Sequence, residues 1–276
     1  MEQEEIRYQF LRPAQAIERR EAFPVAYVPL GNLEWHGPQN PLGADALQAE
    51  GLALLAARKG GGIVFPPLYY GENRLQVLQE AKEAYREEIA KEMRLNPDHF
   101  TPAFFPFDAA EQARSYQSLL LHILAEVESL GFQIAVLVAG HYPLIDSARA
   151  AVLEYNLRVR HHRPDTGMLA WATMDVPLCE DQYPDCGDHG CRWETSHLMY
   201  LYPRCVDLDT LPEDPAEYIP GLGGPHPPQA ATAEFGQKTL AYAAQKLVME
   251  ATHRLQHREL YARCGHWLDE GLWKKP

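Results

Sequence analysis

The stretch FQIAVLV, residues 132–138, decides the fold, because it is a short and almost unbroken apolar run that contains β-branched residues. Runs of this length and composition are typical of strands buried on both faces of a sheet. Gly131 precedes the run, and helical patterns flank it at 111–130 and 145–162. A helix, a strand and a helix in this order predict an α/β fold.

The same alternation extends over the rest of the chain. Further strands are predicted at 25–30 (VAYVPL), 63–65 and 168–171, and further helices at 46–59, 75–94 and 232–256. Residues 95–108 and 220–228 are rich in Pro, Phe or Gly and are predicted to be loops. Strands that alternate with helices imply a mostly parallel sheet with helices on both faces. We expect a single domain over residues 1–276.

Composition and charge narrow the class of protein. The formal net charge of −13 opposes attraction to phosphates, so no nucleic-acid partner is expected. No run reaches the roughly 18 apolar residues that a membrane-spanning helix needs. The acidic start, MEQEEIRYQF, lacks the basic and apolar regions of a signal peptide. We therefore expect a cytoplasmic protein without a membrane partner.

The cysteines predict no disulfide framework, because five of them, an odd number, are spread over a long stretch: Cys179, Cys186, Cys191, Cys205 and Cys264. Cys186 and Cys191 bracket His189, as in a fragment of a zinc site. The chain lacks the second pair of ligands that a structural zinc site needs. Structural zinc is therefore a minor alternative.

The first candidate site residues follow the predicted strand at 25–30. Ligands of parallel α/β folds bind outside the carboxyl ends of the strands, and here lie Glu34, His36 and, at the next helix start, Asp45. Extended backbone points side chains two apart the same way, so the three can form a divalent-metal site. Each also has a simpler interpretation: Asp45 as a helix N-cap, Glu34 as a solvated acid and His36 as a turn residue.

Similar residues follow two other predicted strands. Gly140 allows a sharp turn after 132–138 and would place His141 at the same rim if the two strands are neighbours, although a lone histidine can also be structural. His189 and Glu194 follow the strand at 168–171. They could supply the proton-transfer group and the further ligand that amide hydrolysis needs. An acid at 194 is also favoured by the dipole of the helix that begins there.

Three segments resemble the signature of the creatininase family. Residues 29–45, PLGNLEWHGPQNPLGAD, are similar to P-x-G-S followed by E-x-H-G-P-H-L-P-x-x-x-D. Residues 136–142 resemble the second family segment, N-G-H-x-x-N, and residues 189–196 the third, H-A-G-x-x-E-T-S. Residues 229–236, QAATAEFG, resemble the late A-T-x-E-x-G stretch. The motifs occur in the family's order and cover most of the chain.

The resemblance implies a metal-dependent amidohydrolase that acts on a small, preferably cyclic, amide or a related C–N bond through a metal-activated water. It implies one or two divalent ions per chain, zinc, manganese or iron, and a homo-oligomer such as a hexamer. The residues implied as metal ligands are Glu34, His36, Asp45, His141 and Glu194, with Asp45 as the bridge. Glu194 is alternatively a catalytic carboxylate, His189 would hand a proton to the leaving nitrogen, and Tyr142 and Trp193 would contact the substrate.

The chain also departs from the family pattern. Creatinine hydrolases carry H-Y-E in the second segment, with the glutamate as a metal ligand, whereas this chain has Pro143. Ala139 and Asn40 replace an asparagine and a histidine of the family. Residues 70–108 differ most, which makes creatinine a doubtful substrate. The alternatives are a formylamino-pyrimidine deformylase-like or peptide-trimming relative, with Arg74 and Arg192 as candidates to bind a phosphorylated substrate, and a non-catalytic member with an incomplete metal site.

Overall fold

Four strands form one parallel sheet in the order β2-β1-β3-β4. The computed structural model describes residues 4–71, 85–101, 103–163, 167–262 and 266–267. Within them the strands are β1 (Val25–Leu30), β2 (Ile63–Val64), β3 (Ile134–Ala139) and β4 (Leu169–Thr173). All pair in parallel, with Leu30 of β1 opposite Ala139 of β3. The predicted α/β fold with a parallel sheet is confirmed.

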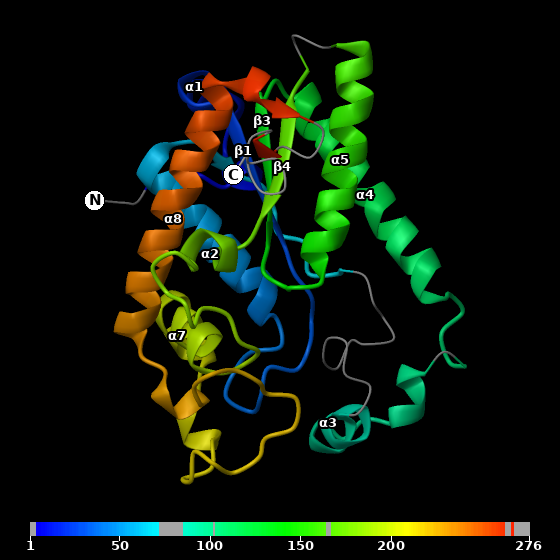
Figure 1. The fold of residues 1–276 in the computed structure, drawn as a ribbon, viewed down its shortest axis with the longest axis vertical. Coiled ribbons are helices and arrows are strands. Elements are labelled where there is room, and N and C mark those ends of the chain that lie inside the picture. The colour runs from blue at the N-terminus through cyan, green and yellow to red at the C-terminus, as the bar shows by residue number, and fades with distance from the viewer. Residues whose placement is uncertain (1–3, 72–84, 102, 164–166, 263–265, 268–276) are drawn as a thin grey trace, which may run out of the picture.

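Helices cover both faces of this sheet (Figure 1). On one side lie α4 (Ala109–Ser129) and α5 (Leu144–His162), and on the other α2 (Ala44–Gly60), α7 (Arg192–Leu201) and α8 (Ala233–Gln256). Successive strand residues alternate between two cores: Ala26 and Val28 pack with the first helices, and Val25 and Tyr27 with the second. Every residue of β1, β3 and β4 is therefore buried, which explains their continuous apolar sequences.

Shorter elements complete the chain. They are α1 (Pro13–Ala22), α3 (Arg86–Glu92), α6 (Asp175–Cys179) and a two-stranded antiparallel pair, β5 (Tyr261–Ala262) and β6 (His266–Trp267). The predicted helix at 75–94 falls partly outside the described residues, and its described part contains α3. The predicted loop at 95–108 contains a single short 3-10 helix, Pro97–Phe100. Among the helices described, none is long and apolar enough to cross a bilayer.

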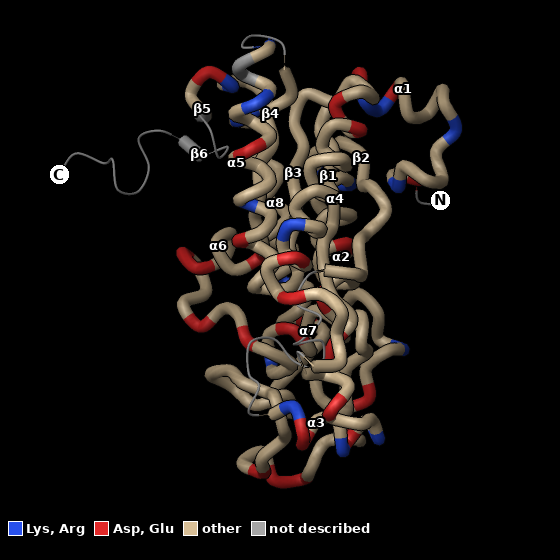
Figure 2. The backbone as a smooth tube through the Cα atoms, turned by 90° about the vertical axis from the view of Figure 1, so that its right-hand side faces the viewer, with Lys and Arg blue, Asp and Glu red and all other residues tan. Residues whose placement is uncertain are grey.

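The direction of the connections between strands reverses between β1 and β3. After β1 the chain continues through α2 to β2, and after β3 it continues through α5 to β4, on the opposite face of the sheet. The two connections therefore leave the sheet in opposite directions, and such a switch point is where α/β folds bind ligands. Figure 2 shows Asp and Glu residues around α7, near this end of the sheet.

Asp45 is not the N-cap of α2, which corrects that interpretation. The helix begins at Ala44 with Gly43 as its N-cap, and Asp45 lies in the first turn. Its carboxylate accepts a hydrogen bond from the backbone N–H of Asn32 at 3.3 Å and not from its own helix. The side chain therefore points out of α2 and toward the loop that follows β1.

Candidate metal centre

Close backbone contacts place the start of α2 against the ends of β1 and β3. A Cβ atom on Gly31 would lie 2.2 Å from the backbone nitrogen of Ala46, and one on Gly140 would lie 2.0 Å from the carbonyl oxygen of Asp45. Only glycine leaves room for such an approach. The two glycines therefore bring Asp45 to the rim where both strands end.

The loop after β1 is held by the segment that precedes α7. Asn40 donates to the carbonyl oxygen of His36 at 3.1 Å and to Thr195 Oγ1 at 2.9 Å, and Gln39 donates to the carbonyl oxygen of Gly190 at 2.7 Å. Gly190 has a φ of +64°, and a Cβ there would lie 2.7 Å from the carbonyl oxygen of His36. These contacts hold residues 29–45 and residues 189–196, the first and third segments that resemble the family signature, against each other.

Asp45 lies between two imidazoles. Its Oδ1 is 2.9 Å from His36 Nε2, and its Oδ2 is 3.3 Å from His141 Nδ1. All three residues are at most 4% exposed. Each carboxylate oxygen therefore faces a different histidine, the arrangement in which one carboxylate can bridge two cations.

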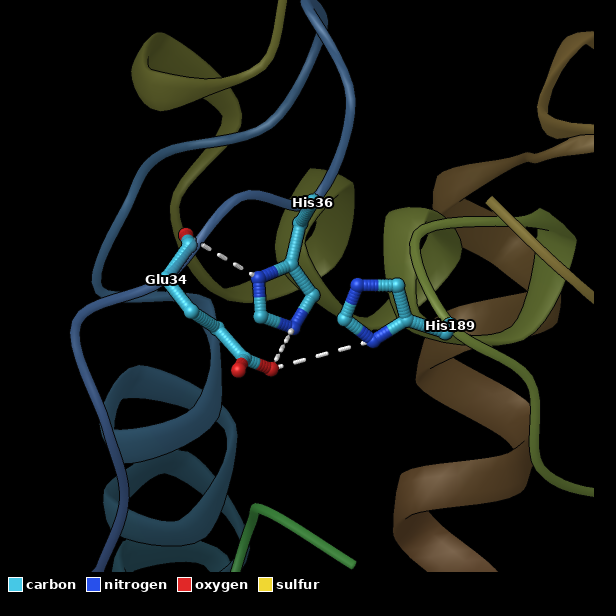
Figure 3. A group of neighbouring side chains, drawn as sticks. All are labelled: Glu34, His36 and His189. Carbon is cyan, nitrogen blue, oxygen red and sulfur yellow. Dashed lines mark hydrogen bonds and ion pairs between the residues drawn. The ribbon is translucent and has the colours of Figure 1, made fainter. Parts of the chain in front are cut away.

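Glu34 brings a second carboxylate to the same place. Its Oε1 lies 3.1 Å from His141 Nδ1, 3.6 Å from His36 Nε2 and 3.8 Å from His189 Nδ1. Figure 3 shows this oxygen between the rings of His36 and His189. Glu34 is 2% exposed, so water does not compensate for the burial of its charge.

A third carboxylate, Glu194, comes from the first turn of α7. Its Oε2 lies 3.5 Å from His36 Nε2 and accepts the backbone N–H of Gly190 at 2.7 Å. Pro143 precedes the first residue of α5 and offers no side-chain oxygen. The structure therefore brings together all six residues predicted for metal binding or proton transfer. They are Glu34, His36, Asp45, His141, His189 and Glu194.

Several buried polar atoms of this cluster have no hydrogen-bond partner. Both carboxylate oxygens of Glu34 and Nε2 of His36 are of this kind; the 2.9 Å approach of His36 Nε2 to Asp45 lacks the geometry of a hydrogen bond. Buried charged groups are costly unless they are paired and hydrogen-bonded or coordinate a metal. Three triplets have ligand atoms within 4.8 Å of one another: Glu34, Asp45 and His141; His36, Asp45 and Glu194; Glu34, His36 and His189. The donor set therefore fits divalent cations.

The charges of the cluster shift the pKa values of its members. Burial lowers the pKa of His36, but Asp45 and Glu194 outweigh it and raise the value to about 10. Burial raises the pKa of Asp45, but His36 and His141 outweigh it and hold the value well below the ordinary range. Burial raises the pKa of both Glu34 and Glu194. Without cations, some groups of the cluster therefore carry protons. Metal binding would release these protons.

His189 differs from the other two imidazoles. Burial, and then the nearby His36, lower its pKa to about 3, so the ring is neutral near pH 7. Its Nε2 lies 2.8 Å from the carbonyl oxygen of Trp35 and must donate there, because a carbonyl only accepts. The lone pair is therefore on Nδ1, the atom that faces Glu34.

A cavity of about 510 Å³ meets the cluster at His189 and Glu194. Tyr142 and Trp193, predicted to contact the substrate, both line it. Tyr142 is 62% exposed, whereas Trp193 is buried and donates from Nε1 to Asp175 Oδ2 at 2.6 Å. Their contact with a substrate stays a prediction.

Two alternatives receive no support among the described residues. The triplets with metal-binding geometry there include neither Cys186 nor Cys191, and the four described cysteines are free. The guanidinium of Arg192 stacks 4.6 Å from the ring centre of Phe235 and does not line the cavity. Arg74 lies outside the described residues.

Sequence reasoning missed the cavity residues Gln48, Asp175 and His197. Glu34 and His141 were predicted because ligands bind outside the carboxyl ends of parallel strands. The same reasoning applies to β4, which ends at Thr173 and is followed by Asp175. Because the predicted strand ends at Trp171, two residues before the observed end of β4, Asp175 lies outside the residues expected directly after the strand. Gln48 and His197 gave no sequence signal, because their role depends on the packing of α2 against α7.

The α/β fold and the buried carboxylates and imidazoles at its switch point fit the class of α/β proteins that bind divalent cations. Within it, the creatininase family model, described as creatinine amidohydrolase, matches residues 11–250, and the chain belongs to this family. A creatinine amidohydrolase from Pseudomonas putida is 26% identical over 206 residues, which are 71% of this chain and 71% of the relative. The resemblance predicted from the motifs is confirmed.

Solved creatininases share the fold. A structure described as creatininase Mn has a TM-score of 0.66 and 20% identity, and the match covers 92% of this chain and 99% of the other. A mutant described as the Zn-Zn type has a TM-score of 0.66 and 19% identity, with 92% and 98% covered. A mutant complexed with creatine has a TM-score of 0.66 and 20% identity, with 92% and 99% covered.

Proposed function

We propose that this chain is a metal-dependent hydrolase that cleaves the C–N bond of a small amide. The observation that carries the proposal is the convergence of six acids and imidazoles at the switch point, five of them buried and His189 partly buried, with the carboxylate of Glu34 and Nε2 of His36 left without hydrogen bonds. A fold that buries such groups loses stability unless they bind an ion. The family of the chain points in the same direction.

Two cations would share Asp45. Glu34, Asp45 and His141 would hold one, and His36, Asp45 and Glu194 the other, because each triplet has mutually close ligand atoms. Glu194 would thus supply the carboxylate that Pro143 does not. Zinc, manganese or iron suits this mixture of oxygen and nitrogen ligands, and two relatives are described as manganese and zinc forms.

The protein's own groups would then position the substrate and move a proton. Bound divalent cations polarise a carbonyl and lower the pKa of water. The lone pair of His189 is on Nδ1, so this is the ring atom through which a proton would pass to the leaving nitrogen. The hydrogen bond from Nε2 to the Trp35 carbonyl fixes the ring during this transfer.

The cavity supports a small substrate. Its volume of about 510 Å³ lies within the range of small-molecule sites. The matched relatives are described as creatinine amidohydrolases, but the different 70–108 segment leads us to propose an amide other than creatinine, preferably a cyclic one. We also propose that the chain acts as a homo-oligomer, as the family resemblance implies.

Metal analysis together with an activity screen tests the proposal. Protein purified without chelator should contain about two transition-metal ions per chain, and zinc, manganese or iron should restore hydrolysis after chelation. Creatinine, formamides, lactams and short peptides should be screened side by side. Absence of bound metal, with no activity gained on adding these ions, would overturn the proposal and favour a non-catalytic family member.

The assignment of Glu194 has its own test. Glu194→Gln removes a negative ligand from one triplet only, so we expect the metal content to fall from about two ions to about one per chain. Glu180→Gln is the matched control, because Glu180 is exposed and belongs to none of the triplets. Two ions retained in Glu194→Gln would assign the second site to other residues.

A further inference from the structure

The cavity beside the metal cluster contains a second set of polar groups. Besides His189 and Glu194, the residues that line it include Gln48, Asp175 and His197. None of these three belongs to a triplet with metal-binding geometry. They are therefore available to recognise a part of a ligand away from the bond to be cleaved.

Gln48 offers an unused hydrogen-bond donor. It is 7% exposed, and its Oε1 lies 3.1 Å from His197 Nδ1. The other ring nitrogen, Nε2, lies 3.0 Å from Thr239 Oγ1, so the imidazole is fixed between α2 and α8. The amide nitrogen of Gln48 has no hydrogen-bond partner. Leaving a buried N–H group without a partner is unfavourable, and a ligand carbonyl would remove this loss.

Asp175 offers an acceptor near the same imidazole. Its Oδ2 accepts from Trp193 Nε1 at 2.6 Å and lies 3.8 Å from His197 Nδ1, the atom that also faces Gln48. A carboxylate has room for several more hydrogen bonds, and this one lines the cavity with its side chain 19% exposed. The donor of Gln48 and the acceptor of Asp175 are thus held around one imidazole.

On the basis of the proposed function, we propose that Gln48 and Asp175 form a subsite for a ureido or carboxamide group of the substrate, separate from the amide that is hydrolysed. The carbonyl of such a group accepts from Gln48 Nε2, and its N–H donates to Asp175. An ammonium group would satisfy Asp175 but leave Gln48 without an acceptor. An alkyl group would satisfy neither, and a carboxylate would be repelled by Asp175.

Hydroxamic acids provide the probes, because their head group chelates the bound metal whatever the tail. Calorimetric titration of the metal-loaded protein should compare tails of equal length that end in a ureido, an isobutyl or an ammonium group. We expect the ureido probe to bind about tenfold or more tightly than the isobutyl probe. Gln48→Leu and Asp175→Asn should each remove most of this preference while leaving the affinity of the isobutyl probe unchanged.

The outcomes separate this proposal from the proposed function. If no hydroxamate binds, the metal site itself fails. If all three tails bind equally, or if the preference survives both substitutions, the metal site stands and the subsite is overturned. Tightest binding of the ammonium probe would also overturn it, in favour of a cation site at Asp175. Retained binding of the isobutyl probe shows that each variant is folded.

Discussion

At the scale of single residues, Asp45 determines how the cluster is organised. It belongs to the triplet with Glu34 and His141 and also to the triplet with His36 and Glu194. Its Oδ1 faces His36, and its Oδ2 faces His141. Burial should raise the pKa of a carboxyl group, yet this pKa is lowered, because the two imidazoles outweigh burial. The residue is therefore held as an anion, ready to bridge two cations.

Replacing Asp45 should empty both metal sites. Asp45→Asn keeps the size of the side chain but removes the charge and one acceptor oxygen, so we expect the metal content to fall from about two ions to well below one per chain. Elemental analysis after purification without chelator measures this. Asp146→Asn is the control, because Asp146 is an exposed acid in the first turn of α5. Equal metal content in the two variants would contradict the bridging role.

His197 should make the stability of the metal-free protein depend on pH. Burial lowers its pKa from 6.5 to about 4, so the unfolded chain binds a proton on acidification before the folded protein does, and stability falls. Between pH 7 and pH 5 we expect the wild type to lose about 2 kcal/mol more unfolding free energy than His197→Gln. Urea denaturation of both proteins measures the difference. An equal loss of unfolding free energy in the two proteins would show that the pKa of His197 does not change on unfolding.

At the scale of elements, the site depends on the close fit of α2 against the ends of β1 and β3. The backbone of Gly31 touches Ala46, and that of Gly140 touches Asp45. Neither contact involves a side chain that could move aside. The position of the bridging carboxylate is therefore set by backbone packing at the switch point.

A methyl group at Gly140 should disturb both folding and the site. Its Cβ would lie 2.0 Å from the carbonyl oxygen of Asp45, so we expect Gly140→Ala to lower the unfolding free energy by about 1–3 kcal/mol and to weaken metal binding. Gly223→Ala is the control, because nothing lies within 4 Å of a Cβ there. Urea denaturation and metal titration check both effects. Equal stability of the two variants would contradict the proposed fit.

The sequence allowed some of these elements to be predicted and not others. Strands β1 and β3 are buried on both faces, so their apolar runs were visible, and four ligand candidates followed from their carboxyl ends. Helix α1 has no buried residue and is rich in charged and polar residues, so its sequence does not indicate an element that packs into the core. The approach of Glu194 to His36 depends on Gly190 packing against the first segment, and contacts so distant in sequence leave no local pattern.

At the scale of the whole molecule, we expect the metal-free protein to be less stable than the metal-bound one. The chain carries a formal net charge of −13, and three of its carboxylates share one buried cluster. Anything that binds only the folded state stabilises it. Divalent cations should therefore act as structural as well as functional partners.

Thermal unfolding should reveal this coupling. Addition of zinc or manganese at about 100 times the dissociation constant should stabilise the folded state by about 2.7 kcal/mol for each ion bound, or about 5 kcal/mol for two, which raises Tm by about 10 °C. Asp45→Asn should show little change under the same conditions. Calorimetry with and without metal measures the shift. An equal shift in the variant would mean that the ions act elsewhere on the protein.

The most direct test of the metal centre is anomalous X-ray diffraction from crystals of the wild-type protein grown with manganese or zinc. We predict two anomalous peaks, one among Glu34, Asp45 and His141 and the other among His36, Asp45 and Glu194. Crystals without a peak at this cluster, in which the same side chains contact only one another or water, would contradict the account.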